Sequence, residues 1–115
     1  MYIIGNKKVH LDFNLLVEIR KTVSVPLVLH GSSSVYREDI VKVINLGIRK
    51  INVGRILKRS YFEALRNACS EVKDDYNNYH VVGSGLDSDV LNRGRVALEK
   101  TVEDLMRLFG SAGKA

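Results

Sequence analysis

The sequence is poor in cysteine and has no long apolar run. Its single cysteine, Cys69, excludes an intramolecular disulfide, which fits a reducing compartment. The apolar neighbours of Cys69 predict a small core residue rather than a nucleophile. No segment approaches the roughly 18 consecutive apolar residues of a membrane span, and the apolar start is too short for a signal peptide. We therefore expect a cytoplasmic protein with no membrane partner.

Nucleic-acid-binding motifs are missing as well. The formal net charge of +5 is compatible with nucleic acid, an anionic membrane or phosphorylated metabolites. However, the lysines and arginines are spread along the chain, without zinc-finger spacing, an aromatic-rich RNA-binding motif or a dense basic block. The sequence therefore predicts no nucleic-acid partner, and a basic phosphate- or nucleic-acid-binding protein is the weakest of the alternatives.

The length of the chain limits its fold. With 115 residues, of which 45% are hydrophobic and 27% charged, it has the composition of a globular domain. It can bury one core, but a complete eight-stranded α/β barrel needs roughly 250 residues.

Predicted helices and strands alternate along the chain, which indicates an α/β fold with a parallel sheet. Two strands leave two unpaired edges, so we expect another chain or a second copy to complete the sheet. The predicted helices cover about 12–22, 37–46, 57–72 and 87–109. The predicted strands cover 23–29, whose continuous apolar run suits burial on both faces, and 49–53, and a loop covers 73–86.

Both predicted strands end in residues that suit ligand binding. His30 follows the first strand and can hold a metal, although a hydrogen-bonded histidine is the more common role and zinc needs three or four ligands. The glycine and serines of 31–34 can cradle an anion or simply cap the next helix. Asn52 can bind a hydroxyl or phosphate, or its own backbone, and Arg55 can contact a phosphate or face solvent.

Five motifs follow one another along the chain: LDF (11–13), PLVLHGSSSV (26–35), LGI (46–48), KINVG (50–54) and LFGSAGKA (108–115). In this order and spacing they resemble the C-terminal part of the class II, zinc-dependent ketose-bisphosphate aldolases, which include the fructose- and tagatose-bisphosphate enzymes. The similarity covers nearly the whole chain and is weakest over 73–85.

This resemblance implies the C-terminal part of a TIM (β/α)8 barrel. Residues 1–72 would supply the last two strands with their helices, 73–86 a loop and 87–109 the C-terminal helix. The implied activity is the reversible aldol cleavage of a ketose 1,6-bisphosphate to dihydroxyacetone phosphate and glyceraldehyde 3-phosphate, a reaction of carbohydrate metabolism and glycolysis. In the family, zinc polarises the ketose carbonyl and stabilises the enediolate. The motifs fit fructose and tagatose substrates equally.

The resemblance also implies roles for individual residues. His30 falls on the third zinc-ligand histidine of the family. The loop that binds the phosphate of dihydroxyacetone phosphate falls on Gly31, Ser32 and Ser33, and the Asn-Val-x-Thr motif falls on Asn52, Val53, Gly54 and Arg55.

The chain departs from the family pattern in several places. The other two zinc histidines and the catalytic aspartate lie upstream in the family, so no catalytic residue is expected within this chain. Arg55 replaces a threonine, Ile56 an acidic residue, and Ser34 a common glycine or aspartate. We therefore expect an incomplete zinc site and little or no aldolase activity from the chain alone. The alternative is a non-catalytic remnant or assembly subunit that self-associates or pairs with an N-terminal half-barrel.

Overall fold

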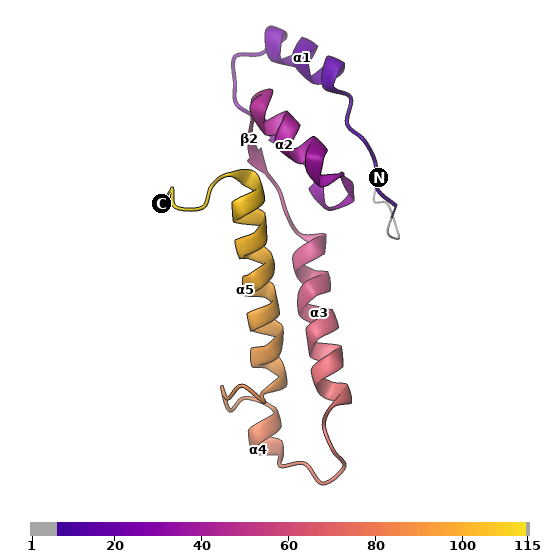
Figure 1. Cartoon of the computed structure of the whole chain (residues 1–115), viewed down its shortest axis with the longest axis vertical. Helices are drawn as coiled ribbons and strands as arrows, with labels where there is room; N and C mark the ends of the chain where they lie inside the picture. Colours follow the sequence, from indigo (N-terminus) through magenta and orange to yellow (C-terminus); the bar gives the residue numbers. More distant parts are fainter. Residues whose placement is uncertain (1–6, 115) are drawn as a thin grey trace. The chain divides into compact units, whose positions relative to one another are not determined.

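A computed structural model of the chain, which describes residues 7–114, contains the predicted alternation of helices and strands (Figure 1). The chain divides into two compact units. One comprises Met1–Gly54 with Met106–Ala115, and the other comprises Arg55–Leu105. The elements, in chain order, are α1 (Phe13–Thr22), β1 (Leu27–Leu29), the 3-10 helix η1 (Ser32–Ser34), α2 (Arg37–Asn45), β2 (Ile48–Ile51), α3 (Arg55–Ser70), α4 (Asn78–Val81) and α5 (Val90–Phe109).

Helix α1 begins where its sequence predicts. The Asp12 carboxylate accepts a hydrogen bond of 2.9 Å from the Leu15 amide, the usual arrangement of an N-cap. Although its apolar residues lie at helical spacing, α1 has no fully buried residue, and Leu15 and Ile19 are 56% and 41% exposed.

Among residues 7–114, no helix has both the length and the hydropathy of a membrane span.

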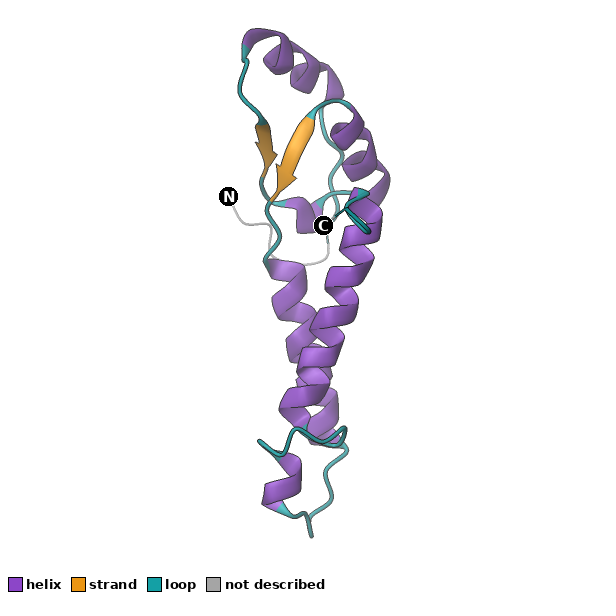
Figure 2. Ribbon diagram, turned by 90° about the vertical axis from the view of Figure 1, so that its left-hand side faces the viewer, coloured by secondary structure: helices purple, strands orange, loops and turns teal. Residues whose placement is uncertain are grey.

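The two strands form a parallel pair (Figure 2). Val28 pairs with Lys50 and Leu29 with Ile51. The first strand is shorter than the predicted 23–29, because backbone hydrogen bonds between strands form only where β2 lies beside Leu27–Leu29. The prediction that the first strand is buried on both faces is wrong for the described residues, since Val28 is 42% exposed.

The core of the first unit lies where α2 packs on the sheet. Val35, Ile40, Val43 and Ile48 are each no more than 5% exposed. Between α2 and β2 the chain turns at Gly47, whose φ of +115° is strongly disfavoured for residues with a side chain. Gly47 thus directly follows the C-cap residue Leu46, at the position where helices commonly end on a glycine.

The second unit is an antiparallel pair of helices, with α3 and α5 side by side (Figure 1). The Ser60 hydroxyl donates to the Ala97 carbonyl oxygen at 3.0 Å and lies 2.7 Å from the Thr101 hydroxyl. Gly94 permits close approach, because a Cβ there would lie 2.8 Å from the Tyr61 ring. These contacts set the spacing of the two helices.

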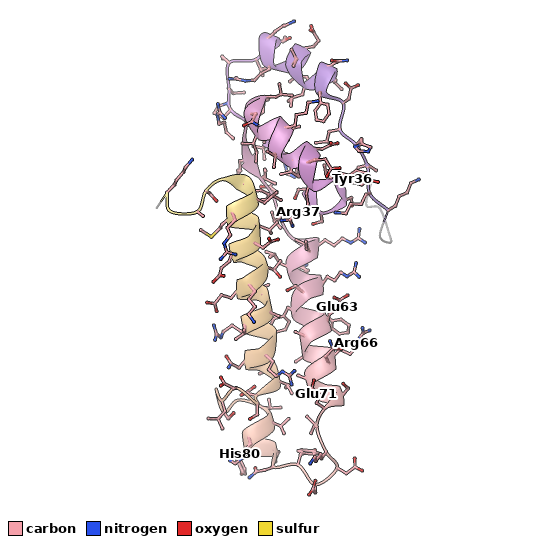
Figure 3. All side chains as sticks on the ribbon, in the orientation of Figure 1. Tyr36, Arg37, Glu63, Arg66, Glu71 and His80 are labelled. Carbon is pink, nitrogen blue, oxygen red and sulfur yellow. The ribbon has the colours of Figure 1, made fainter. Side chains whose placement is uncertain are left out.

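One ion pair joins the far ends of this helix pair. Arg93 binds Glu71, which follows the last residue of α3 (Figure 3). The guanidinium lowers the pKa of Glu71, and the carboxylate in turn raises the pKa of Arg93.

Three predictions about the second unit are corrected. The predicted loop 73–86 contains the short helix α4, whose N-cap is Asn77. The last helix begins at Val90 rather than at residue 87. Its cap is Asp89, which is 1% exposed and accepts hydrogen bonds of 2.9 Å from the amides of Gly85 and Leu91. Cys69 is exposed rather than buried, because it lies on a face of α3 that no described element covers.

Candidate functional site

His30 and Asn52 meet at the carboxyl ends of the two strands. Each is the first residue after its strand. Because Val28 pairs with Lys50 and side chains alternate along a strand, the residues two positions further on share one face of the sheet. The Asn52 Nδ2 atom lies 3.2 Å from Nδ1 and 3.3 Å from Nε2 of the His30 imidazole.

The ladder continues past β2 into this site. The Asn52 amide donates to the Leu29 carbonyl oxygen at 2.9 Å. Backbone hydrogen bonds therefore hold the two strands together as far as His30 and Asn52. This limits how far the two side chains can move relative to each other.

The loop after His30 is a tight turn. Gly31 has a φ of +71°, and the following serines form the 3-10 helix η1. The Ser34 amide donates to the Gly31 carbonyl oxygen at 3.2 Å, and the Val35 amide donates to that of Ser32 at 3.1 Å. A Cβ on Gly31 would meet no atom within 4 Å, so backbone conformation rather than crowding favours glycine here.

A side chain connects the two strand-exit loops. The Ser32 hydroxyl donates to the Asn52 carbonyl oxygen at 2.9 Å. His30, Ser32 and Asn52 thus form one hydrogen-bonded group, called here the strand-exit cluster. It places three of the residues singled out in the sequence within reach of one small ligand.

The remaining candidate residues lie close by in the sequence. Ser33 is half-buried within η1. Val53 is half-buried and Gly54 exposed, and both lead out of β2. Arg55 is exposed and begins α3, so it belongs to the second unit.

Among the described residues, His30 is the candidate zinc ligand that the sequence predicts. His30 is exposed and offers a ring nitrogen. Within residues 7–114, no group of three or more histidine, cysteine, aspartate or glutamate side chains is placed to hold a metal ion. A catalytic zinc takes three protein ligands, so the others would have to come from outside this part of the chain.

A second group of residues supports the end of the same loop. The Asp39 carboxylate is buried, accepts a hydrogen bond of 2.8 Å from the Leu11 amide and lies 3.1 Å from Nδ1 of His10. The His10 ring stacks on Tyr36, at the start of α2 (Figure 3), with centroids 4.2 Å apart. The Val9 amide donates to the Ser34 carbonyl oxygen at 2.8 Å.

These contacts tie residues 9–11 to the turn that follows the candidate phosphate loop. The sequence carries no signal for them, because the partners are 28 and 29 positions apart. In the sequence, the presence of an aspartate at position 39 is already explained by the first turn of α2, where a carboxylate interacts favourably with the helix dipole.

Asp39 should make the stability of the first unit depend on pH. The Leu11 amide, together with the nearby His10 and Lys42, holds the pKa of Asp39 below the ordinary aspartate value. When the pKa of a carboxyl is lower in the folded than in the unfolded state, its ionised form stabilises the fold. This stabilisation is fully present above the pKa of the unfolded state, about 3.9 for aspartate. It is lost as the pH falls through the pKa of the folded state. We expect urea midpoints, followed by circular dichroism, to fall over this acidic range in the parent and to fall less in Asp39→Asn.

The neighbouring exposed carboxylate serves as the control for that measurement. Glu38→Gln removes an acidic group from the same helical turn without touching the Leu11 amide. An identical pH dependence in Asp39→Asn and Glu38→Gln would contradict the role given to Asp39.

Residues 2–114 match the family model described as "Fructose-bisphosphate aldolase class-II". Similar proteins include the sulfofructosephosphate aldolase of Alkalicoccus urumqiensis, 37% identical over 105 residues, which are 91% of this chain and 33% of that protein. The fructose-bisphosphate aldolase of Ureaplasma parvum serovar 3 (strain ATCC 700970) is 33% identical over 109 residues, 90% of this chain and 34% of that protein.

A similar fold occurs in the X-ray crystal structure of the YdjI aldolase from Escherichia coli K12. It has a TM-score of 0.74 and 33% sequence identity, covering 92% of this chain and 36% of that chain. The present chain thus spans about a third of the length of these relatives. The likeness confirms the predicted α/β fold as the C-terminal part of a TIM barrel. The chain belongs to the class II fructose-bisphosphate aldolase family.

Proposed function

We propose that this chain is the C-terminal, phosphate-binding part of a class II ketose-bisphosphate aldolase. The parent reaction is the reversible aldol cleavage of a ketose 1,6-bisphosphate to dihydroxyacetone phosphate and glyceraldehyde 3-phosphate. The observation that supports it is the strand-exit cluster, in which His30, Ser32 and Asn52 join at the carboxyl ends of adjacent parallel strands. In α/β barrels the loops at these strand ends hold the ligand.

His30 would contribute one imidazole to a zinc ion whose other ligands lie outside the chain. A zinc ion, when bound, supplies Lewis-acid polarisation of a carbonyl. When one ring nitrogen coordinates a metal, the other carries the proton and donates it. Asn52, whose Nδ2 now lies against the ring, would then turn its carboxamide so that Oδ1 accepts a hydrogen bond from this ring N–H. Asn52 is thereby a positioning residue for His30.

The turn at Gly31–Ser33 would bind the phosphate of the sugar. Backbone amides in such a turn suit an anion, whereas the Ser32 hydroxyl already donates to Asn52 and is left with acceptor capacity. The chain's net charge of +5 favours a phosphorylated ligand. Arg55, at the start of α3, would be an altered phosphate contact, larger than the threonine it replaces.

The phosphate site can be tested on the chain itself by titrating labelled protein with dihydroxyacetone phosphate and following its amide resonances. We expect saturable shifts at 30–33 and 52–54. In Asn52→Ala binding should weaken about tenfold or more, because without zinc an N–H of the Asn52 carboxamide would donate to the phosphate, and a hydrogen bond to a charged group contributes roughly 1.5–3 kcal/mol. His80→Ala, which removes an exposed imidazole on α4 of the second unit, should bind like the parent.

Two outcomes would contradict the proposal. Resonance shifts that do not saturate, or that saturate elsewhere on the chain, would contradict a phosphate site at 30–33 and 52–54.

Whether the chain holds enough zinc ligands is tested separately by an aldolase assay with a ketose bisphosphate and added zinc, in which we expect no turnover. Zinc-dependent turnover that His30→Ala abolishes would show that the chain holds a complete site.

A further inference from the structure

The segment before α1 holds the backbone that follows the candidate phosphate turn at 31–33. Val9 is bonded through both of its backbone polar groups. Its amide donates to the Ser34 carbonyl oxygen at 2.8 Å, and its carbonyl oxygen accepts a hydrogen bond from the Tyr36 amide at 3.3 Å. The position of Ser34, and with it the end of the turn, therefore depends on where Val9 lies.

The side chain next to Val9 fixes this segment to the start of α2. The His10 ring lies on the Tyr36 ring, with planes 17° apart, and its Nδ1 atom lies 3.1 Å from the Asp39 carboxylate. Because His10 and Val9 are neighbours in the chain, a ring that left Tyr36 would move the Val9 backbone as well. The contacts of His10 thus act on Ser34 through Val9.

The hold of His10 depends on charge. Its contact to Asp39 joins an imidazole to a carboxylate that stays ionised when histidines titrate, because the Leu11 amide and nearby positive charge lower the pKa of Asp39. Besides His10, residues 8–11 and 36–42 carry the following charged or titratable side chains: Lys8, Tyr36, Arg37, Glu38, Asp39 and Lys42.

Protonation changes how firmly the ring binds this carboxylate. A neutral imidazole carries one proton, and it can donate to Asp39 only when that proton is on Nδ1. The imidazolium carries protons on both nitrogens, so its bond to Asp39 is always available and is charge-assisted. A cation is also attracted to the face of an aromatic ring such as that of Tyr36. The His10 side chain is 68% exposed, so it exchanges protons with solvent.

We propose that His10 is a positioning residue for the phosphate-binding turn, and that its protonation tightens the hold of Val9 on Ser34. Histidine is the side chain that changes charge between about pH 5 and 8. The contribution of His10 to the affinity for a phosphorylated ligand should therefore rise as the pH falls through this range, since a turn that is already ordered costs less to bind. That consequence rests on the proposed function, whereas the effect of His10 on Ser34 does not.

The effect on affinity is tested by titrating the parent and His10→Asn with dihydroxyacetone phosphate at about pH 6 and about pH 8. Asparagine can still donate to Asp39, but it takes up no proton and has no ring to lie on Tyr36. We expect the parent to bind about threefold more tightly than the variant at the lower pH, and by a smaller factor at the higher pH. Ionisation of the phosphate and of His30 affects both proteins alike, so the ratio of their affinities reports on position 10.

The hold on Ser34 is tested without a ligand, by hydrogen exchange of the Val9 amide. After correction for the intrinsic pH dependence of exchange, protection of this amide in the parent should be greater at the lower pH. In His10→Asn it should not change. His80→Asn is the matched control and should behave like the parent, since it removes an exposed imidazole from α4 of the second unit.

Two changes at Tyr36 test the stacked ring. Tyr36→Leu removes the aromatic face and should reduce the pH dependence of Val9 protection. Tyr36→Phe keeps the face and should behave like the parent.

The proposal would be overturned by Val9 protection that changes with pH equally in the parent and in His10→Asn, or that does not change in the parent. An affinity ratio that is the same at both pH values would overturn it as well. If the parent does not bind dihydroxyacetone phosphate, the proposed function is contradicted, and hydrogen exchange of the Val9 amide still decides whether His10 positions Ser34.

Discussion

Replacing Ile40 with alanine should lower the free energy of unfolding by about 2–5 kcal/mol, the range for removing a large aliphatic side chain from a core. Ile40 is 3% exposed on the face of α2 that packs toward the sheet. The first unit has few fully buried side chains, so little neighbouring core is available to close the resulting cavity. Urea denaturation followed by circular dichroism measures the change.

The adjacent residue provides the control for this prediction. Val41 is 41% exposed on the same helix, and Val41→Ala should change the free energy of unfolding by no more than about 0.5 kcal/mol. If Ile40→Ala is unfolded without urea while Val41→Ala folds, the prediction also holds. Similar midpoints for the two variants would show that α2 does not pack as described.

Replacing Gly47 with alanine should cost about 1–3 kcal/mol, the price of holding a residue with a side chain in a sparsely populated conformation. The φ of Gly47 is +115°, and a Cβ there would also overlap the Arg20 side chain. Because Arg20 is flexible and exposed, it can move aside, so most of the loss should come from the backbone. Thermal denaturation of the variant measures it.

Two further variants separate backbone strain from crowding. Gly54→Ala, at a glycine without positive φ and with open space around it, should have a small effect on stability. Repeating Gly47→Ala in an Arg20→Ala background should recover little of the loss. Full recovery there would show that the contact with Arg20, and not the backbone angle, requires glycine.

Helix positions could be predicted from the sequence, because their signals are local. The Asp12 cap and the apolar spacing that follows it define α1 without reference to other elements. The exact cap of α5 was not predictable, because Asp87, Ser88 and Asp89 are all good capping types and only the loop geometry selects Asp89.

Strand length and burial depend on partners that a single sequence does not reveal. Residues 23–25 have the composition of a strand, but no described strand pairs with them, so only Leu27–Leu29 forms a ladder. Burial on both faces was predicted from the apolar run, and it requires elements that the described part of the chain does not supply.

The meeting of His30 and Asn52 was predictable because parallel strands end at one edge of a sheet. The link from Ser32 to the Asn52 backbone, and the contacts of Asp39 with residues 10 and 11, were not, since both depend on how distant segments pack. Assignment of the cluster to zinc and phosphate remains a prediction that the titration and the assay address.

The hydroxyl of Ser32 bonds to a main-chain oxygen at position 52 and not to the side chain there. Every amino acid carries that oxygen, so the two loops can keep their separation whatever residue replaces asparagine. The side chain at position 52 can therefore be exchanged while the hydrogen bond that joins the two loops stays in place.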